Sequence, residues 1–311
     1  MLSVIIPAYN EEKCIKRAYT VIHSLLSENN IKSEFIFVDD GSTDQTYKII
    51  NELSSEEKNI VGLHFSRNFG KESAISAGLT AASGNCAVVI DCDLQHPPEK
   101  IVEMYHLWEQ GYEIVEGIKK ERGQEKKMYT IGAKFFYSVI SRMAGFDMAN
   151  SSDFKLLDRK VIDVLNKMPE RGFFRAISYW VGYNKTTVEF DVGERIGGES
   201  KWSASGLIKY ALSNISSYST APMQTVTLLG FVMLIISVIF GGWALIDKII
   251  GRALEGMTTV IIITIFIGSI IMISLGIIGY YIARIYEEIK GRPKYIISST
   301  VKSAKEKTDI I

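Results

Sequence analysis

This sequence lacks an excess of charge of either sign, and it has few cysteines. Its 311 residues include 35 Lys and Arg and 35 Asp and Glu, so the formal net charge is zero. A nucleic-acid-binding protein usually shows a strong basic excess, and the composition argues against that class. The three cysteines, Cys14, Cys86 and Cys92, show neither a pairing pattern nor metal-ligand spacing. They indicate a protein of a reducing compartment.

Charge is also missing from two long apolar stretches. No charged residue occurs in 210–246 or in 256–283. Within these stretches, residues 226–246 and 259–283 each reach the ~20 apolar residues that a helix needs to cross a bilayer. The alternative is a pair of buried core helices, which the length and purity of the runs disfavour. Because the joining segment 247–257 is short, we predict a two-helix transmembrane hairpin.

Basic residues flank the predicted hairpin on its outer sides. The joint itself carries only Lys248 and Arg252. By the positive-inside rule, we predict a two-span protein of the cell membrane, with the N-terminal part and both termini in the cytoplasm. No signal peptide is expected, because a strand-like pattern over 2–7 begins immediately. The flanking basic residues are Arg195, Lys201, Lys209, Arg284, Lys290, Arg292 and Lys294.

Residues 1–120 alternate between strand patterns and helix patterns. Such alternation predicts an α/β fold with a doubly wound, mainly parallel sheet that binds ligands at the carboxyl ends of its strands. Thr43 has the residue type and position of a helix cap. The predicted strands are 2–6, 34–38, 60–65, 86–90 and 113–116, and the predicted helices are 11–27, 43–53, 71–82 and 98–110.

Two amphipathic segments follow this region. For 128–146, packing on its own domain and binding at the membrane surface are equally open. The segment 204–218 runs directly into the first predicted span, which favours an interfacial helix. The polar, lysine-bearing segment after Pro293 is expected to form a loose tail. The predicted divisions are a cytoplasmic α/β domain at 1–203, an interfacial helix at 204–222, the hairpin at 223–287 and a cytoplasmic tail at 288–311.

The most informative motif follows the apolar run 87–90, which is typical of a buried strand. Asp91 and Asp93, two positions apart, lie on the same side of an extended backbone, and the amide of Gln95 can join them. Hard oxygen ligands in this arrangement suit Mg²⁺ or Mn²⁺, completed by the phosphates of a ligand. The alternative is a solvated acidic turn that ends at two prolines.

Polar clusters also follow the first three predicted strands, at 7–12, 39–44 and 66–71. Because neighbouring parallel strands end at the same edge of a sheet, these clusters and residues 91–95 are expected to line one crevice. Each cluster alone is ordinary turn chemistry. Together they favour a nucleotide site with a metal ion on the diphosphate.

These motifs carry a resemblance to a known family. Residues 7–12, 39–44 and 91–99 resemble the motifs of inverting family 2 glycosyltransferases, which have the GT-A fold. The Asp-x-Asp-Leu-Gln-His-Pro-Pro-Glu sequence, combined with a C-terminal hairpin, is similar to polyprenyl-phosphate glycosyltransferases. This group includes bactoprenol glucosyltransferases and dolichyl-phosphate mannose synthases. The resemblance covers nearly the whole chain and implies that 1–203 is a GT-A catalytic domain.

The resemblance also implies roles for individual residues. Asp91, Asp93 and Gln95 would hold Mg²⁺ or Mn²⁺ against the donor diphosphate. Cys92 stands where the family more often has alanine, and its backbone would make the contact. The donor-binding residues implied in this way are Pro7, Tyr9, Asn10, Glu11, Val38, Asp40, Asp91, Cys92, Arg195 and Lys201.

Basic residues outside the acidic clusters are implied to bind phosphate. Segment 195–202 resembles the family's region near the donor diphosphate and the lipid phosphate, so Arg195 and Lys201 would serve both. The alternative is a juxtamembrane loop held by anionic lipid headgroups. Arg122 would receive the acceptor phosphate, although family members often have two arginines there. A solvated charge run is an equal alternative for Arg122 and the lysines before it.

Asp153 resembles the aspartate assigned as catalytic in the bacterial glucosyltransferase branch, and the resemblance makes Asp93 its catalytic companion. A general base removes a proton in the transition state. A phosphate monoester, however, has a second pKa of about 6 and is largely ionised near neutral pH. We therefore expect Asp153 to orient the acceptor or to support positive charge at the sugar carbon. The alternatives are a helix N-cap or a partner for Lys155.

The sequence thus predicts an enzyme that transfers one sugar, with UDP-glucose the favoured donor, to undecaprenyl or another polyprenyl phosphate. Inversion would give a β-linked lipid-phosphate sugar for the cell envelope. One alternative is a processive polysaccharide synthase, but no Gln-x-x-Arg-Trp motif occurs. The other is a catalytically silent membrane scaffold, which would not need the metal acids. Glycines in the predicted spans would permit a homo-oligomer.

Overall fold

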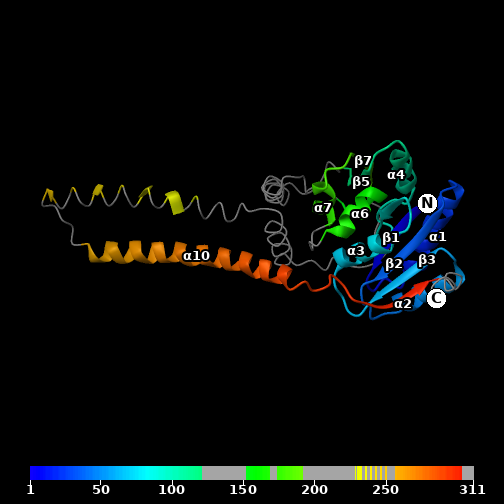
Figure 1. Ribbon diagram of the computed structural model, residues 1–311, viewed down its shortest axis with the longest axis horizontal. Helices are drawn as coiled ribbons and strands as arrows, with labels where there is room; N and C mark the ends of the chain where they lie inside the picture. Colours follow the sequence, from blue (N-terminus) through cyan, green and yellow to red (C-terminus); the bar gives the residue numbers. More distant parts are fainter. Residues whose placement is uncertain are drawn as a thin grey trace. The chain divides into compact units, whose positions relative to one another are not determined.

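A computed structural model describes residues 1–120, 152–168, 174–191 and 256–302, together with parts of 228–250. The chain divides into two compact units. The first contains Met1–Ser203 and Pro293–Ile311, and the second contains Ala204–Arg292. The strands of the sheet and helices α1 to α7 belong to the first unit, whereas α10 belongs to the second (Figure 1).

Strands and helices alternate from β1 to β5, as the sequence predicts for residues 1–120. The second unit contributes α10, between β7 and β8 in chain order. The elements are β1 (Leu2–Ala8), α1 (Ile15–Glu28), β2 (Ser33–Asp39), α2 (Thr46–Glu56), β3 (Ile60–Phe65), α3 (Lys71–Ala81), β4 (Cys86–Val89), α4 (Glu99–Glu109), β5 (Ile114–Lys119), β6 (Lys155–Asp158), α6 (Arg159–Lys167), α7 (Phe174–Trp180), β7 (Lys185–Phe190), α10 (Met257–Ile289) and β8 (Ile297–Lys302).

Among the described residues, eight strands form one sheet in the order β7-β5-β6-β4-β1-β2-β3-β8. The four central strands β4, β1, β2 and β3 are parallel to one another. Strand β6 runs antiparallel between β4 and β5, and β8 runs antiparallel to β3. The predicted parallel sheet is therefore confirmed at its centre, while the complete sheet is mixed.

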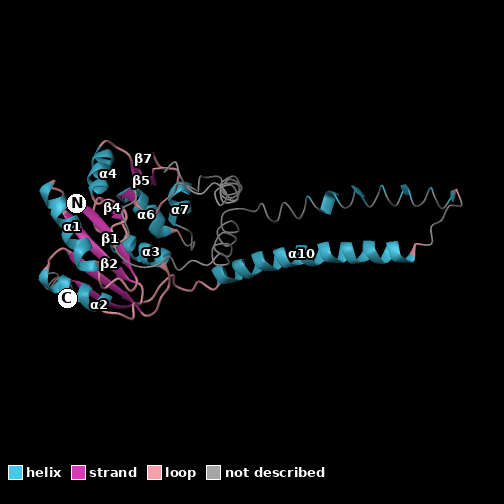
Figure 2. Cartoon of the chain, turned by 180° about the vertical axis from the view of Figure 1, so that it is seen from behind, coloured by secondary structure: helices cyan, strands magenta, loops and turns pink. Residues whose placement is uncertain are grey.

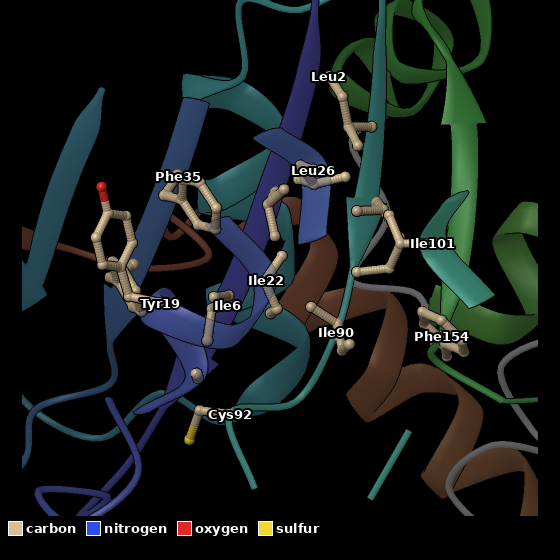
Figure 3. Packing of buried hydrophobic residues seen from close by; sticks show 14 of the residues in the cluster. Leu2, Ile6, Tyr19, Ile22, Leu26, Phe35, Ile90, Cys92, Ile101 and Phe154 are labelled. Carbon is tan, nitrogen blue, oxygen red and sulfur yellow. The ribbon is translucent and has the colours of Figure 1, made fainter. Parts of the chain in front are cut away.

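Helices cover both faces of the sheet, which explains why the central strands are apolar throughout (Figure 2). Successive residues of a strand point to opposite faces. Ile6 belongs to the core cluster that α1, α2 and α4 also enter (Figure 3), whereas Ile5 lies against Gly78 of α3 on the other face. Every residue of β1 is consequently buried. Burial on both faces is the doubly wound arrangement that the sequence predicts.

Strand β8 returns the chain to the sheet after α10 (Figure 1, red). Val301 pairs with Gly62 of β3, and the ring of Tyr295 stacks on Phe65 at a centroid distance of 5.1 Å. The sequence predicts a loose tail after Pro293, but residues 297–302 form an edge strand. The hydrophobic signal of β8 is weak because Val301 is its one residue that packs against the described core cluster.

The described part of the second unit contains a helix that is long and apolar enough to cross a membrane. Within α10, Phe266–Ala283 has a mean hydropathy of 2.0 and none of it is buried. The other predicted span, 226–246, is described only in part. Its described residues are helical, and the side chains of Phe231 and Trp243 are 61% and 59% exposed. The two-helix hairpin remains a prediction, and the amphipathic segments 128–146 and 204–218 lie outside the described residues.

Candidate active site

A cavity of about 320 Å³ opens at the carboxyl ends of the central parallel strands. Its walls come from the loops after β1, β2, β3 and β4 and from the first turns of α3. The four polar clusters of the sequence therefore meet in one place, as the carboxyl ends of parallel strands require. The lining residues are Pro7, Ala8, Tyr9, Glu11, Asp40, Asn68, Gly70, Lys71, Ala74, Asp91, Cys92 and Asp93.

Reciprocal hydrogen bonds join the loops that follow β1 and β2. The backbone N–H of Asn10 donates to Ser42 Oγ at 2.9 Å, and Asn10 Oδ1 accepts the N–H of Thr43 at 2.9 Å. The carboxylate of Glu12 accepts the N–H of Gln45 at 3.1 Å. These loop contacts explain why α1 and α2 begin several residues later than predicted. Asn10, a predicted donor-binding residue, holds the two loops together.

Asp40, a predicted nucleoside-binding residue, fixes the loop that leads into α3. Its two carboxylate oxygens accept the N–H groups of Phe69 at 2.6 Å and Gly70 at 2.9 Å. Burial raises the pKa of Asp40, and these two hydrogen bonds act against that rise. Gly70 has φ +97°, a conformation that favours glycine. The next residue, Lys71, therefore enters the cavity from a rigidly held backbone.

A chain of ion pairs connects the Asp-x-Asp motif to Asp153. Lys71 Nζ lies 2.7 Å from Asp91 Oδ1 and 2.9 Å from Asp91 Oδ2. The same ammonium lies 3.0 Å from Asp153 Oδ2. On the other side of Asp153, the guanidinium of Arg175 makes a two-point contact at 2.7 Å and 3.1 Å. Asp153 is thus held between two cations, and Lys71 is shared between two carboxylates.

These cations keep Asp153 ionised. Burial alone would raise its pKa, but the charge of Lys71 and the hydrogen bonds and charge of Arg175 outweigh burial and hold the pKa well below its usual value. A carboxylate with so low a pKa is a poor proton acceptor at neutral pH. The geometry therefore favours an orienting or electrostatic role for Asp153. Lys155, the partner that the sequence offers for Asp153, forms an ion pair with Glu116 at 3.1 Å, and the negative charge of Asp153 also acts on Lys155.

The residues predicted to hold a metal ion lie around the same cavity. Asp91 and Asp93 line it, and the backbone N–H of Gln95 donates to Asp93 Oδ1 at 3.1 Å. Burial raises the pKa of Glu11, and the charges of Asp93 and Asp91 add to that rise. This local excess of negative charge favours a cation.

Within the described ranges, no three His, Cys, Asp or Glu side chains form a cluster that could hold a metal by themselves. Mg²⁺ is usually bound by one or two carboxylates together with waters and substrate phosphates. The donor set of Asp91 and Asp93 therefore fits an ion that is completed by a diphosphate. It does not fit a site built from protein ligands alone.

Glu72 adds a titratable group beside this charge network. Burial raises its pKa from 4.5 to about 7, and the negative charge of Asp153 contributes to the rise. Its carboxylate accepts the N–H of Phe174 at 2.8 Å. The folded protein therefore keeps this proton to about pH 7, whereas the unfolded chain releases it near pH 4.5. The resulting stability is fully present below pH 4.5 and is lost as the pH rises through 7.

We expect Glu72→Gln to stabilise the protein more at pH 8 than at pH 5, by about 1–3 kcal/mol, since glutamine cannot ionise and still accepts the Phe174 N–H. The measurement is the melting temperature of both proteins in detergent across this range. Glu52→Gln, at a residue whose side chain is 46% exposed, is the matched control. A constant difference between Glu72→Gln and the unmodified protein at all pH values would contradict the assignment.

The structure also locates residues that the sequence left without a role. The sequence places Lys71 only within the polar cluster at 66–71, and it assigns no role to Arg175. A signal for Lys71 existed, because a cation in the first turn of a helix opposes the helix dipole and needs compensating charge. Val38, a predicted donor-binding residue, is fully buried in β2 and is not among the residues that line the cavity. Three predicted phosphate-binding residues lie outside the described residues, namely Arg122, Arg195 and Lys201.

Comparison with known proteins identifies the chain's relatives. The family model described as "Glycosyl transferase family 2" matches residues 3–165. An uncharacterised glycosyltransferase from Synechocystis is 38% identical over 96% of this chain and 94% of its own length. The bactoprenol glucosyl transferase of Shigella phage SfII is 35% identical over 96% of this chain and 98% of its own length. A prophage bactoprenol glucosyl transferase homologue from Escherichia coli is 36% identical over 97% of this chain and 99% of its own length.

Solved structures are more distant. Glucosyl-3-phosphoglycerate synthase from Mycobacterium tuberculosis, crystallised with Mn²⁺, uridine diphosphate and phosphoglyceric acid, is 19% identical with a TM-score of 0.49. The match covers 70% of this chain and 76% of that one.

Proposed function

This chain belongs to glycosyltransferase family 2, and we propose that it transfers one sugar from a nucleotide diphosphate sugar to a polyprenyl phosphate. The observation that carries the proposal is the cavity at the carboxyl edge of the sheet, which Asp91, Asp93, Glu11 and Lys71 line together. Carboxylates for a metal–diphosphate and a cation for phosphate are the groups that such a transfer needs. Relatives named bactoprenol glucosyl transferase support the lipid phosphate as acceptor and glucose as the sugar.

Asp91 and Asp93, with Gln95 beside them, are the residues we propose to hold Mg²⁺ or Mn²⁺. When bound, such an ion would neutralise charge on the departing nucleotide diphosphate. The remaining donor contacts are proposed for residues around the cavity, chiefly Tyr9 and Glu11, while Asp40 acts by holding the α3 loop. Of the other predicted donor-binding residues, Pro7 and Cys92 line the cavity.

The acceptor side is proposed to depend on Asp153. Its carboxylate remains charged between Lys71 and Arg175, so it can support positive charge that develops at the sugar carbon. The acceptor phosphate is itself largely ionised near neutral pH and can attack without prior loss of a proton. Attack from the face opposite the leaving diphosphate would invert an α-linked donor to a β-linked product.

The path of the chain supports a membrane hairpin. Strand β8 pairs with β3 in the same sheet as β1, so both ends of the second unit join the first unit. A chain that leaves and returns to one side of a bilayer must cross it an even number of times. If α10 crosses, a second crossing is needed, and 226–246 is the apolar segment available for it. We propose that 1–203 and β8 form a cytoplasmic catalytic domain beside the headgroups, where the acceptor phosphate lies.

The donor can be identified with a panel of nucleotide sugars. Purified full-length protein would be incubated with undecaprenyl phosphate, Mg²⁺ and each donor in turn, and the lipid product detected by mass. We expect UDP-glucose to give the fastest transfer, with a β anomeric linkage by NMR. Faster transfer from a GDP-sugar would overturn the proposed donor, and an α-linked product would overturn the inversion.

A further inference from the structure

Lys71 occupies the position in which a metal ion would be expected to meet Asp91. Its single ammonium contacts both oxygens of the Asp91 carboxylate, at 2.7 Å and 2.9 Å. It also lines the cavity, and its side chain is 40% exposed. A divalent ion that approached this carboxylate alone would meet the positive charge of Lys71 at close range.

The position of Lys71 is fixed from both ends of the residue. Its backbone follows Phe69 and Gly70, whose N–H groups are held by Asp40. Its ammonium is anchored by Asp153, which is itself held by Arg175. The ammonium of Lys71 is therefore held beside Asp91 and Asp153 in the donor-free protein.

We propose that Lys71 makes metal binding at Asp91 depend on the donor diphosphate. This inference rests on the proposed function of the cavity. In the donor-free protein, Lys71 acts as the counter-ion of Asp91 and opposes a metal ion alone. A diphosphate brings enough negative charge to offset both cations. Lys71 then exchanges the Asp91 carboxylate for a phosphate oxygen and keeps its contact with Asp153.

This exchange couples the two ends of the site. While Lys71 is bound to Asp91, the metal carboxylate and Asp153 share one cation. Once Lys71 turns to the diphosphate, it lies between the leaving group and the carboxylate that we assign to the reacting centre. Metal and nucleotide should then raise each other's affinity by the same factor, because linkage is reciprocal.

The test measures Mn²⁺ binding to the full-length protein by electron paramagnetic resonance of the free ion, with and without UDP. For the unmodified protein we expect weak binding of Mn²⁺ alone and binding about tenfold or more tighter with UDP. Lys71→Met should tighten the binding of Mn²⁺ alone by about tenfold and reduce the effect of UDP. Lys71→Arg, which keeps the charge, should resemble the unmodified protein. Lys16→Met, at an exposed lysine paired with Glu52, is the matched control.

Unchanged or weaker binding of Mn²⁺ alone by Lys71→Met would overturn the inference. It would also be overturned if Lys71→Arg bound Mn²⁺ alone as tightly as we expect of Lys71→Met. Should Lys71→Met fail to fold, the unmodified protein still decides, because tight binding of Mn²⁺ without UDP contradicts a resident counter-ion. Absence of Mn²⁺ binding even with UDP would overturn the proposed metal–diphosphate site together with this inference. UDP-enhanced binding that is indifferent to Lys71 would overturn the inference alone.

Discussion

Replacing Asp93 with asparagine is expected to slow sugar transfer by about 10²–10³-fold, since one preorganised charge at the reacting centre contributes on this scale. Asp93 lines the cavity and accepts the N–H of Gln95. Asparagine keeps the size of the side chain and an oxygen for that hydrogen bond, but it removes the negative charge. The loss should therefore appear in transfer and in the binding of Mn²⁺ with UDP, while the melting temperature changes little. The rate is measured as label passing from UDP-glucose to polyprenyl phosphate.

The matched control is Asp163→Asn. Asp163 is 54% exposed on α6, where it pairs with Arg159 at 3.6 Å, and it contributes nothing to the cavity. This variant should transfer sugar at the unmodified rate. If Asp93→Asn also kept its rate and its binding of Mn²⁺ with UDP, the metal-binding role of the Asp-x-Asp motif would be wrong.

Removal of the residues after Pro293 is expected to destabilise the first unit strongly, although the deleted segment is short. The deletion removes β8, the stacking of Tyr295 on Phe65, and the hydrogen bond from Ser299 Oγ to the hydroxyl of Tyr47. Loss of two half-buried apolar side chains, together with the strand pairing, costs roughly 2–4 kcal/mol. For a unit of this size, the melting temperature should fall on the order of 10 °C. Thermal unfolding of the full and shortened chains in detergent measures the change.

Single substitutions in the same segment separate the stability contributions of packed and exposed side chains. Val301 packs against the core, and Val301→Ala should cost about 1 kcal/mol. Ile296 is 51% exposed, so Ile296→Ala should cost much less. If the shortened chain had the same melting temperature as the full chain, β8 would not contribute to the stability of the first unit. The inference that the membrane is crossed an even number of times would then lose its support.

Local sequence patterns were sufficient for the parts of the fold that local physics determines. The apolar run before Asp91 predicts a buried strand because both faces of the central sheet are covered, and β4 is that strand. The polar clusters meet at one edge because parallel strands share a direction. The starts of α1 and α2 were less predictable, since contacts such as that between Asn10 and Thr43 join separate loops.

The sequence pattern did not predict the long-range pairings, for a physical reason. Strand β8 pairs with β3, although most of the chain separates the two strands in sequence. The residues of β8 are mostly polar and exposed, so their pattern does not indicate a strand that packs on the core. The ion pairs of Lys71 with Asp91 and Asp153 depend on how α3 is placed against two other loops. A sequence supplies the charged residues but not the distances among them. The sequence gives acceptor chemistry as the argument for the role of Asp153, whereas its ion pairs with Arg175 and Lys71 exist only in the folded chain.

The proposed charge arrangement gives each acidic group a separate task. Asp40 holds the loop before α3. We propose that Asp91 and Asp93 serve the leaving diphosphate and that Asp153 acts at the reacting centre. Lys71 connects Asp91 to Asp153. All of these proposed roles depend on one claim, that this cavity transfers sugar to a lipid phosphate with a divalent ion at its Asp-x-Asp motif.

The most direct test of that claim is transfer of label from UDP-glucose to undecaprenyl phosphate by the purified full-length protein in lipid nanodiscs, with Mg²⁺ or Mn²⁺ and with the metals removed by chelation. We expect a labelled polyprenyl-phosphate glucose that forms only when metal and acceptor are both present. Transfer that continued at the same rate after chelation, or the absence of transfer from every nucleotide sugar tested, would contradict it.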